Sequence, residues 1–280
     1  MANKDYTYAQ VLAGTGYYQV ETTPQYSVGV LTMQSRLQYC GYAITVDGLF
    51  GGGTKSIVES FQTECNLLVD GQAGKNTLTQ LDKVYNSNYF KTYGKLITSS
   101  SWGRTYILQG NCNDIDMLAR CIWVEERGIK DAQSAVAQVI KNRSGSTDSS
   151  YIASAVSYPN ASKWARVIGC SGQYDSAASS QAYAPKRGDP NKADGIDDYW
   201  KNAVDLAAKM RNGTAFTVPN GYSVNSAGTV STTKNGVVSA QMNQVGKSTY
   251  QANKSKCSSV VIYATSFSPT LLNVFCNISW

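Results

Sequence analysis

The chain has 280 residues, enough for two domains. Apolar residues make up 42% of it and charged residues 16%, a composition that allows a buried core. No apolar run is long enough to cross a membrane. The formal net charge is +6, and the Lys and Arg residues are scattered along the chain. Such a charge is compatible with binding an anionic polymer, but also with ordinary solubility. No aromatic-plus-basic motif indicates a nucleic-acid partner. The complete absence of histidine excludes Ser-His-Asp and Cys-His catalysis and the usual His-based zinc sites.

The N-terminal stretch, residues 1–13, lacks the apolar segment of a secretory signal. We therefore expect the protein to be made in the cytoplasm, where reduced thiols are the default for its seven cysteines. In an oxidising space, Cys40 could pair with Cys65, or Cys257 with Cys276. The cysteine count is odd and no C-x-x-C occurs, so no metal and no cofactor are expected.

An internal repeat follows. Residues 46–54 and 69–77 both read V-D-G-x-x-G-x-x-T, with the second copy 23 residues after the first. Asp47 and Asp70 are placed to accept hydrogen bonds from backbone N–H groups two residues on, as in tight turns. Thr54 and Thr77 are then expected to be the N-caps of the helices that follow.

Helical spacing of apolar residues precedes and follows each turn, which predicts a compact three-helix unit over 27–85. The pattern L-Q-x-x-G-Y…V-D-G-x-F-G-x-x-T…V-x-x-F-Q…V-D-G-x-x-G-x-x-T-L resembles the peptidoglycan-binding module often called PG-binding domain 1. The matching positions are Leu37, Gln38, Gly41, Tyr42, Val46, Asp47, Gly48, Phe50, Gly51, Thr54, Val58, Phe61, Gln62, Val69, Asp70, Gly71, Gly74, Thr77 and Leu78. Most of them are expected to hold turns and core, and the resemblance implies bacterial peptidoglycan as the partner.

Residues 86–113 are polar and rich in Ser, Asn, Tyr and Gly, which predicts a linker, partly packed through Trp102 and Tyr106. Asp114 then opens a helix that ends at Gly128. Cys121 lies in its apolar stretch and is expected to be a small core residue.

Two glutamates lie at the end of this helix. Helical spacing places Glu125 near the middle of the apolar face and Glu126 at its other edge, with Arg120, Arg127 and Asp116 on the opposite side. Burial of a carboxyl group raises its pKa, which a proton donor to a glycosidic oxygen requires. The alternative is a pair of surface glutamates at a frayed helix end, salt-bridged to Arg127.

The segments after Glu125 extend this pattern. Asp131 is placed to cap a second helix over about 132–143, and a third helix ends at Asn212-Gly213. The order resembles the catalytic domain of SleB-like cell-wall hydrolases, the spore-cortex-lytic family, whose members read L-A-R-x-I-x-x-E-A-R-G-E, V-x-x-V-x-N-R, I-x-x-V-I-x-x-x-G-Q-F and A-x-x-A-x-x-x-x-x-G. This chain matches at Leu118, Ala119, Arg120, Ile122, Glu125, Arg127, Gly128, Val136, Val139, Asn142, Arg143, Val167, Ile168, Gly172, Gln173, Ala203, Ala207 and Gly213.

The resemblance implies a catalytic domain over 114–280, clear to about 214, with a lysozyme-like helical fold. The whole chain is thus expected to be mainly α with some β-structure (α+β). The family's catalytic Glu falls on Glu125. This chain departs from the family pattern at three positions: Glu126 replaces the Ala that follows the catalytic Glu, Ile129 replaces the second Glu, and Tyr174 replaces the Phe. Glu126 is therefore the alternative catalytic residue.

By resemblance, the protein acts as a lytic transglycosylase on the MurNAc–GlcNAc β-1,4 bond. Glu125 would protonate the leaving oxygen and then accept the proton of the C6 hydroxyl of the same MurNAc, giving a 1,6-anhydro product. Gln173 and Tyr174 would line the sugar cleft and Asn142 would support the site. Their alternative roles are a turn residue, a core aromatic and a helix C-cap.

Two other functions remain open. A hydrolytic muramidase would need a second carboxylate, for which Asp175 and Asp148 are candidates. A wall-anchoring structural protein with an inactive second domain would need none. An amidase is disfavoured because the chain has no histidine.

Residues 215–280 contain strand-like runs at 258–265 and 271–277. In lacking a secretory signal the chain resembles phage endolysins, which act on the wall after release through a separate membrane lesion. The alternative setting is a spore or injection-device enzyme with its own export route.

Overall fold

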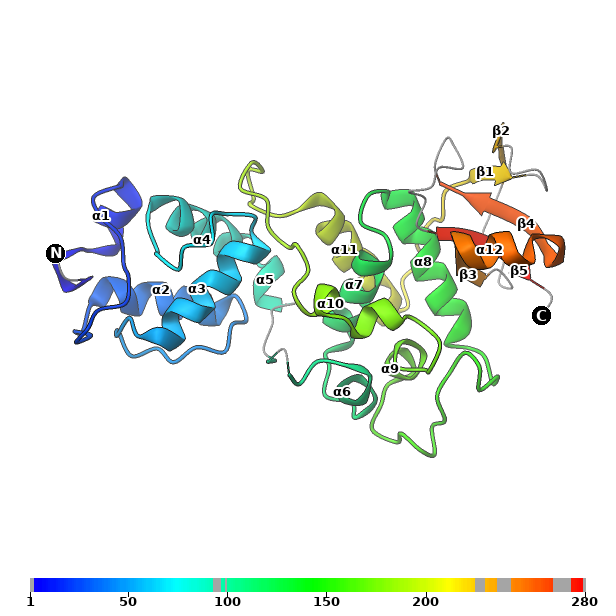
Figure 1. Cartoon of the computed structure of the whole chain (residues 1–280), viewed down its shortest axis with the longest axis horizontal. Coiled ribbons are helices and arrows are strands. Elements are labelled where there is room, and N and C mark those ends of the chain that lie inside the picture. The colour runs from blue at the N-terminus through cyan, green and yellow to red at the C-terminus, as the bar shows by residue number, and fades with distance from the viewer. Residues whose placement is uncertain are drawn as a thin grey trace. The chain divides into compact units, whose positions relative to one another are not determined.

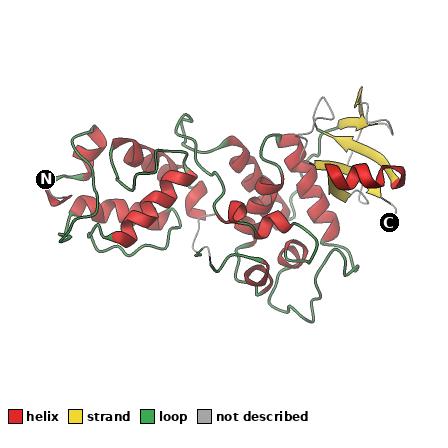
Figure 2. Ribbon diagram, viewed as in Figure 1, coloured by secondary structure: helices red, strands yellow, loops and turns green. Residues whose placement is uncertain are grey.

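The computed structural model describes residues 3–92, 97–98, 100–224, 230–235, 243–263 and 273–278. The chain divides into two compact units, the first formed by residues 1–100 and 184–201 and the second by residues 101–183 and 202–280 (Figure 1). Helices dominate and the strands gather near the C-terminus (Figure 2), which confirms the predicted mainly α, α+β class. Among the described residues, no helix is both long and apolar enough to span a membrane.

The first unit contains the three expected helices, α2 (Val28–Tyr39), α3 (Gly52–Glu64) and α4 (Lys75–Ser87). Their apolar faces enclose a core in which Val30, Phe50, Phe61 and Leu81 are fully buried. Three short helices, which the sequence did not predict, accompany them: η1 (Asn3–Asp5), α1 (Tyr8–Ala13) and α5 (Tyr89–Thr92).

A buried glutamine organises each turn of the internal repeat. Gln34 donates from Nε2 to Asp47 Oδ1 at 3.0 Å and to Thr54 Oγ1 at 3.1 Å, and its Oε1 accepts the N–H of Gly48 at 2.8 Å. In the second copy Gln62 makes the equivalent bonds, to Asp70 Oδ1 at 2.9 Å, to Thr77 Oγ1 at 3.2 Å and from the N–H of Gly71 at 3.0 Å. The repeated sequence therefore encodes a repeated hydrogen-bond frame.

The expected aspartate bonds are present in both turns. Asp47 Oδ1 accepts from Leu49 N, and Asp70 Oδ1 from Gln72 N, each at 2.9 Å. The prediction that Thr54 and Thr77 are N-caps was wrong, because each helix begins earlier, with a glycine as its N-cap and no capping side chain. The two threonines are buried instead, and their hydroxyls donate back to turn carbonyls.

Residues 184–201 belong to the first unit although they lie far along the chain. Arg187 and Glu64, both at most 1% exposed, form an ion pair with Nε and Oε2 2.5 Å apart. Arg187 also donates to Tyr42 Oη at 3.1 Å and lies 4.0 Å from the centre of the Phe90 ring. Gly188 passes so close to α3 that an added Cβ would lie 2.5 Å from Cys65 Sγ. This segment is thus fastened to the three-helix core.

Up to residue 212, the helices of the second unit are α6 (Arg104–Leu108), α7 (Asp114–Glu125), α8 (Lys130–Arg143), α9 (Lys163–Ile168), η2 (Asp175–Ala178), α10 (Ser180–Tyr183) and most of α11 (Asp198–Asn212); α12 (Lys247–Asn253) and η3 (Lys254–Lys256) follow among the strands. The helices expected from the sequence around 114–128, 131–143 and 198–212 are among them. Asp131 does not cap α8, which starts one residue earlier with Ile129 as its N-cap; Asp131 lies in the first turn, where a carboxylate favours the helix dipole.

Within 86–113, expected as a linker, the described residues include the end of α4, α5 and α6; residues 93–96 and 99 lie outside the described part. The second unit ends in a five-stranded sheet of order β2-β1-β4-β5-β3, formed by β1 (Gly221–Val224), β2 (Val230–Asn235), β3 (Asn243–Gly246), β4 (Cys257–Ile262) and β5 (Asn273–Ile278). β4 and β5 fall in the two strand-like runs, whose residues 264, 265, 271 and 272 lie outside the described part.

A small core ties α12 (Lys247–Asn253) to this sheet through Tyr250, Ile262 and Val274. The seven cysteines are free thiols in this structure, and the compartment stays a prediction. The sulfurs of Cys257 and Cys276 are 3.4 Å apart on neighbouring strands.

Candidate functional site

Helix α7 carries the two candidate glutamates. It begins where Asn113 Oδ1 accepts the N–H groups of Ile115 and Asp116, at 2.9 and 3.2 Å, and two aspartates in its first turn complement the helix dipole. Its residues 117–124 are all buried, and Cys121 is fully buried as predicted. The helix ends at Glu125, so this residue stands at the point where the buried helix meets the surface.

Glu125 is half-buried, and its Oε1 accepts a hydrogen bond from the hydroxyl of Ser176 in η2. The fully buried Cys121 is one helical turn before it. Burial raises the pKa of the Cys121 thiol well above its ordinary value, and the neighbouring Glu125 carboxylate raises it further. The structure thus places Glu125 between buried α7 side chains and the polar η2 turn, with part of its side chain accessible.

Glu126 is the more buried of the two, at 4% exposure. The helix has already ended, so its backbone is extended (φ −145°, ψ 109°) and helical spacing no longer predicts where its side chain points. Its Oε1 accepts the N–H of Gly128 at 3.0 Å, and its backbone carbonyl accepts from Gln133 Nε2 at 2.8 Å. These bonds hold the tight connection between α7 and α8. The alternative of two surface glutamates is therefore wrong for Glu126.

Tyr174 lies next to this site. Its backbone is left-handed (φ 36°, ψ 48°), a conformation that costs a bulky residue on the order of 1 kcal/mol or more and that recurs at functional sites. The ring is 7% exposed, and the Arg143 guanidinium lies 5.2 Å from its centre. Burial raises the pKa of the Tyr174 hydroxyl, Arg143 opposes this rise, and Glu125 is close enough to add to it. Tyr174 and Arg143 thus complete the surroundings of Glu125.

Replacing Tyr174 by Phe is expected to leave stability within about 1 kcal/mol of wild type, because the buried hydroxyl makes no hydrogen bond of normal geometry to the described residues. Chemical denaturation measures this. A loss well above this value would mean that the hydroxyl has a hydrogen-bond partner inside the buried site.

The other two predicted residues lie in the second unit. Gln173 is half-buried in the turn after α9, where its N–H donates to the carbonyl of Cys170 at 3.2 Å. Asn142 is half-buried on α8, and its Oδ1 accepts from Gln138 Nε2 at 2.7 Å. Both therefore hold local structure, and a role toward substrate remains a prediction for each.

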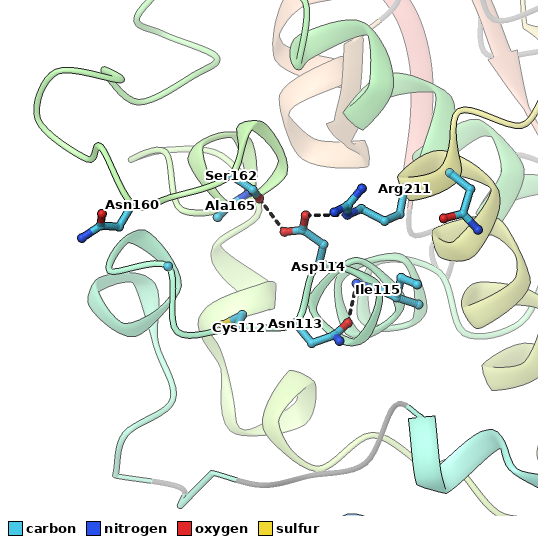
Figure 3. A pocket seen from close by; sticks show the side chains of 10 residues that line it. Cys112, Asn113, Asp114, Ile115, Asn160, Ser162, Ala165 and Arg211 are labelled. Atoms are coloured by element: carbon cyan, nitrogen blue, oxygen red, sulfur yellow. Dashed lines mark hydrogen bonds and ion pairs between the residues drawn. The ribbon is translucent and has the colours of Figure 1, made fainter.

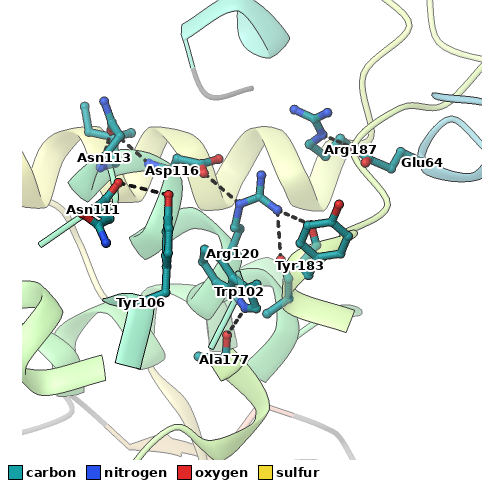
Figure 4. Close-up of polar contacts among 12 residues, drawn as sticks. Glu64, Trp102, Tyr106, Asn111, Asn113, Asp116, Arg120, Ala177, Tyr183 and Arg187 are labelled. Atoms are coloured by element: carbon teal, nitrogen blue, oxygen red, sulfur yellow. Dashed lines mark hydrogen bonds and ion pairs between the residues drawn. The ribbon is translucent and has the colours of Figure 1, made fainter. Parts of the chain in front are cut away.

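Arg120 is a residue whose place the sequence analysis got wrong. Expected on the outer side of α7, it is fully buried. It pairs with Asp116, donating from Nε at 2.8 Å, donates to the carbonyls of Ala182 and Tyr183, and lies over the Trp102 ring (Figure 4). Helical spacing missed it because an arginine can be buried when carbonyls, a carboxylate and a ring surround its guanidinium.

This arrangement fixes the segment that carries Ser176. Trp102 Nε1 donates to the carbonyl of Ala177 at 2.9 Å, directly after Ser176, while Arg120 holds the end of α10. Arg104 pairs with Asp175 on the other side of Ser176. Three side chains thus hold the short η2–α10 stretch against α7, where Ser176 reaches Glu125.

A pocket of about 540 Å³ lies at the opposite end of α7 (Figure 3). Its wall includes Asp114, whose carboxylate accepts from the Ser162 hydroxyl and pairs with Arg211 Nε at 3.1 Å. At 1.5 Å rise per residue, Asp114 and Glu125 are separated by roughly 16 Å along the helix. This pocket is therefore distinct from the surroundings of Glu125.

Comparison with known proteins defines the class of the first unit. Residues 27–81 match the family described as "Putative peptidoglycan binding domain", which spans α2, α3 and both repeat turns. The resemblance of this region to a peptidoglycan-binding module is therefore confirmed.

The chain is also similar to spore cortex-lytic enzymes. It is 36% identical to one from Bacillus cereus over 132 residues (41% of this chain, 50% of that enzyme) and 34% identical to one from Oceanobacillus iheyensis over 149 residues (41% and 53%). A shorter match of 60 residues, 40% identical, covers 21% of this chain and 18% of the enzyme from Halalkalibacterium halodurans. The chain spans about half the length of the curated relatives it matches, and no solved structure matches it significantly.

Proposed function

We propose that the protein degrades bacterial peptidoglycan, with residues 27–81 binding the wall and the second unit cleaving glycan strands at the MurNAc–GlcNAc β-1,4 bond as a lytic transglycosylase. The observation that carries the proposal is Glu125, a half-buried carboxyl group at the end of a buried helix, hydrogen-bonded to a hydroxyl. The similarity to spore cortex-lytic enzymes and the peptidoglycan-binding match support it.

The partner of Glu125 suits a group that must both give and take a proton. A hydroxyl donates to a carboxylate and, after rotating, accepts from a carboxylic acid, so Ser176 serves Glu125 in both protonation states. Ser176 is in turn held by the stretch that Trp102 and Arg104 fix. These contacts support the proposal, because general acid–base catalysis requires a carboxyl group in a defined position.

In the proposed reaction Glu125 gives its proton to the glycosidic oxygen as the bond from that oxygen to C1 of MurNAc breaks. The C6 hydroxyl of the same MurNAc then bonds to C1, and its proton passes to the Glu125 carboxylate. The products are a GlcNAc end with a free hydroxyl and a 1,6-anhydro-MurNAc end, and the acid is restored. This reaction needs neither a water molecule nor a second carboxylate.

A hydrolytic muramidase is the second candidate, because Asp175 directly precedes Ser176. The Asp175 carboxylate is 76% exposed and paired with Arg104. Asp148, the other candidate, is exposed and closes a turn by accepting the N–H of Ser150 at 2.8 Å. Both carboxylates therefore have local partners of their own, which supports the transglycosylase, whose reaction needs no second carboxylate.

Mass spectrometry of purified wall digested by the protein tests the proposal. We expect muropeptides that end in 1,6-anhydro-MurNAc, which resist borohydride reduction, and we expect Asp175→Asn to leave their yield within a few-fold of wild type. Reducing MurNAc ends, lost in Asp175→Asn, would establish the muramidase instead.

A further inference from the structure

Two pockets on the first unit are related by the internal repeat. The repeat-1 pocket, about 530 Å³, is lined among others by Thr45, Asp47, Leu49, Gly51, Gly53 and Thr54. The repeat-2 pocket, about 320 Å³, is lined among others by Leu68, Asp70, Gln72, Gly74, Asn76 and Thr77. Each residue of the second set lies 23 positions after its counterpart in the first, so the same part of each repeat forms each pocket.

The two pockets share one backbone frame. Gln34 and Gln62 fix the turns by equivalent hydrogen bonds, and Gly51 and Gly74 are the N-caps of α3 and α4, without a capping side chain. The space beside these N-caps is open: a Cβ added at Gly51 would meet no atom within 4 Å, and one added at Gly74 would meet only Tyr17 Cβ, at an ordinary contact distance of 3.6 Å.

Apolar side chains stand exposed where the pockets open. Leu49, at 37% exposure, lines the repeat-1 pocket, and Leu68 (80%) and Tyr17 (44%) line the repeat-2 pocket. Exposed apolar groups beside a hollow with a few polar groups mark ligand sites. Asp47 supplies an anionic acceptor, because hydrogen bonds from the N–H of Leu49 and from Gln34 lower its pKa. Apolar walls beside a carboxylate suit a saccharide ring, which offers C–H faces and hydroxyl donors.

We infer that the first unit has two saccharide-binding sites, one at each repeat, and that both bind sugar units of peptidoglycan glycan strands. The inference rests on the proposed function for the identity of the polymer, which the match over 27–81 supports since it spans both turns. It does not depend on catalysis. Two linked sites bind a polymer far more tightly than either alone, because binding at one raises the local concentration of sugar at the other.

The sites differ in chemistry. Ile44, Leu49 and Ile57 make the wall of the repeat-1 pocket mainly apolar, whereas in the repeat-2 pocket Gln72, Lys75 and Asn76 add hydrogen-bond donors, one of them a cation, beside the apolar Leu68 and Tyr17. We expect the repeat-1 pocket to prefer the GlcNAc ring and the repeat-2 pocket the MurNAc ring, whose lactyl ether and carbonyl oxygens accept hydrogen bonds from such donors.

Filling each pocket tests the inference. Gly53→Trp and Asn76→Trp introduce an indole at equivalent positions near the start of α3 and α4, where the backbone has negative φ and the native residue is exposed. Thr63→Trp, on the exposed side of α3 outside both pockets, is the matched control. All three are made in the full chain carrying Glu125→Gln, so that the wall is not digested during the measurement.

Co-sedimentation with purified sacculi should show about a 100-fold loss of affinity in each single variant, no detectable binding in the double variant and no loss in Thr63→Trp. Titration with GlcNAc–MurNAc disaccharide, followed by NMR, should shift backbone amides in both turns, 47–54 and 70–77. Gly53→Trp should abolish only the first set and Asn76→Trp only the second.

Milder variants guard against misfolding. Asp47→Asn and Asp70→Asn keep the Oδ1 acceptor of each turn while removing its charge, and each should weaken sedimentation several-fold. Disaccharide shifts confined to one turn, or an unchanged sacculus affinity after either pocket is filled, would overturn the two-site inference. A parent chain that does not sediment with sacculi at all would instead contradict peptidoglycan as the partner.

Discussion

Replacing Glu125 by Gln is expected to lower the rate of wall clearing by about 10²- to 10⁴-fold, the usual contribution of a general acid–base group. The change is isosteric and keeps an oxygen that accepts from the Ser176 hydroxyl, but the amide can neither give nor take the proton that the reaction moves. Binding to sacculi should be unchanged, because residues 27–81 are untouched. Turbidity loss of a purified wall suspension and co-sedimentation measure the two properties separately.

Glu126→Gln is the matched control, one position along the chain. Glu126 is 4% exposed and its carboxyl oxygen accepts from the N–H of Gly128, a bond that a glutamine oxygen preserves. We expect clearing within a few-fold of wild type. The reverse pattern, with Glu126→Gln inactive and Glu125→Gln active, would make Glu126 the acid. Two fully active variants would mean that neither glutamate is the acid. A wild-type chain that binds sacculi but does not clear them would support the wall-binding protein without catalysis.

The elements that the sequence predicted well are those with local causes. The turns at Asp47 and Asp70 and the helices around them follow from Gly, Asp and apolar spacing, and the structure has them. The N-caps were missed because Thr54 and Thr77 have buried partners, Gln34 and Gln62, that lie well before them in the chain. A threonine after a turn has the same local pattern whether its hydroxyl caps the helix or joins a buried frame.

Around Glu125, too, the sequence predicted the features with local causes and missed those that depend on residues far along the chain. Periodicity placed Glu125 and Cys121 on the apolar face of α7, and the structure has Cys121 fully buried and Glu125 half-buried. It could not give Ser176, whose contact with Glu125 joins residues 51 positions apart. Nor could it give the burial of Arg120, since its carbonyl partners at 182 and 183 follow more than 60 positions later. Such contacts depend on tertiary packing, and a single sequence carries no local sign of them.

The largest expected effect on stability lies at the Glu64–Arg187 pair. Glu64→Gln removes one charge of a pair whose members are at most 1% exposed, and leaves the Arg187 guanidinium charged and buried. Breaking such a pair typically costs about 3–5 kcal/mol. We expect the unfolding transition of the first unit to move to clearly lower urea concentration, and the anchoring of residues 184–201 on α3 to be lost with it.

Two comparisons separate this effect from a general loss of charge. Glu59→Gln breaks the Lys55–Glu59 pair on the same helix, whose side chains are 46% and 38% exposed, and should cost less than about 1 kcal/mol. The double change Glu64→Gln with Arg187→Met should recover much of the loss, because it removes the unpaired charge while keeping an unbranched side chain beside Phe90. Equal urea midpoints for Glu64→Gln and Glu59→Gln would show that the buried pair does not hold residues 184–201 on α3. The backbone carbonyl of Glu64 would then be sufficient to hold them, since it accepts from the backbone N–H groups of Arg187 and Gly188 at 3.1 and 3.0 Å.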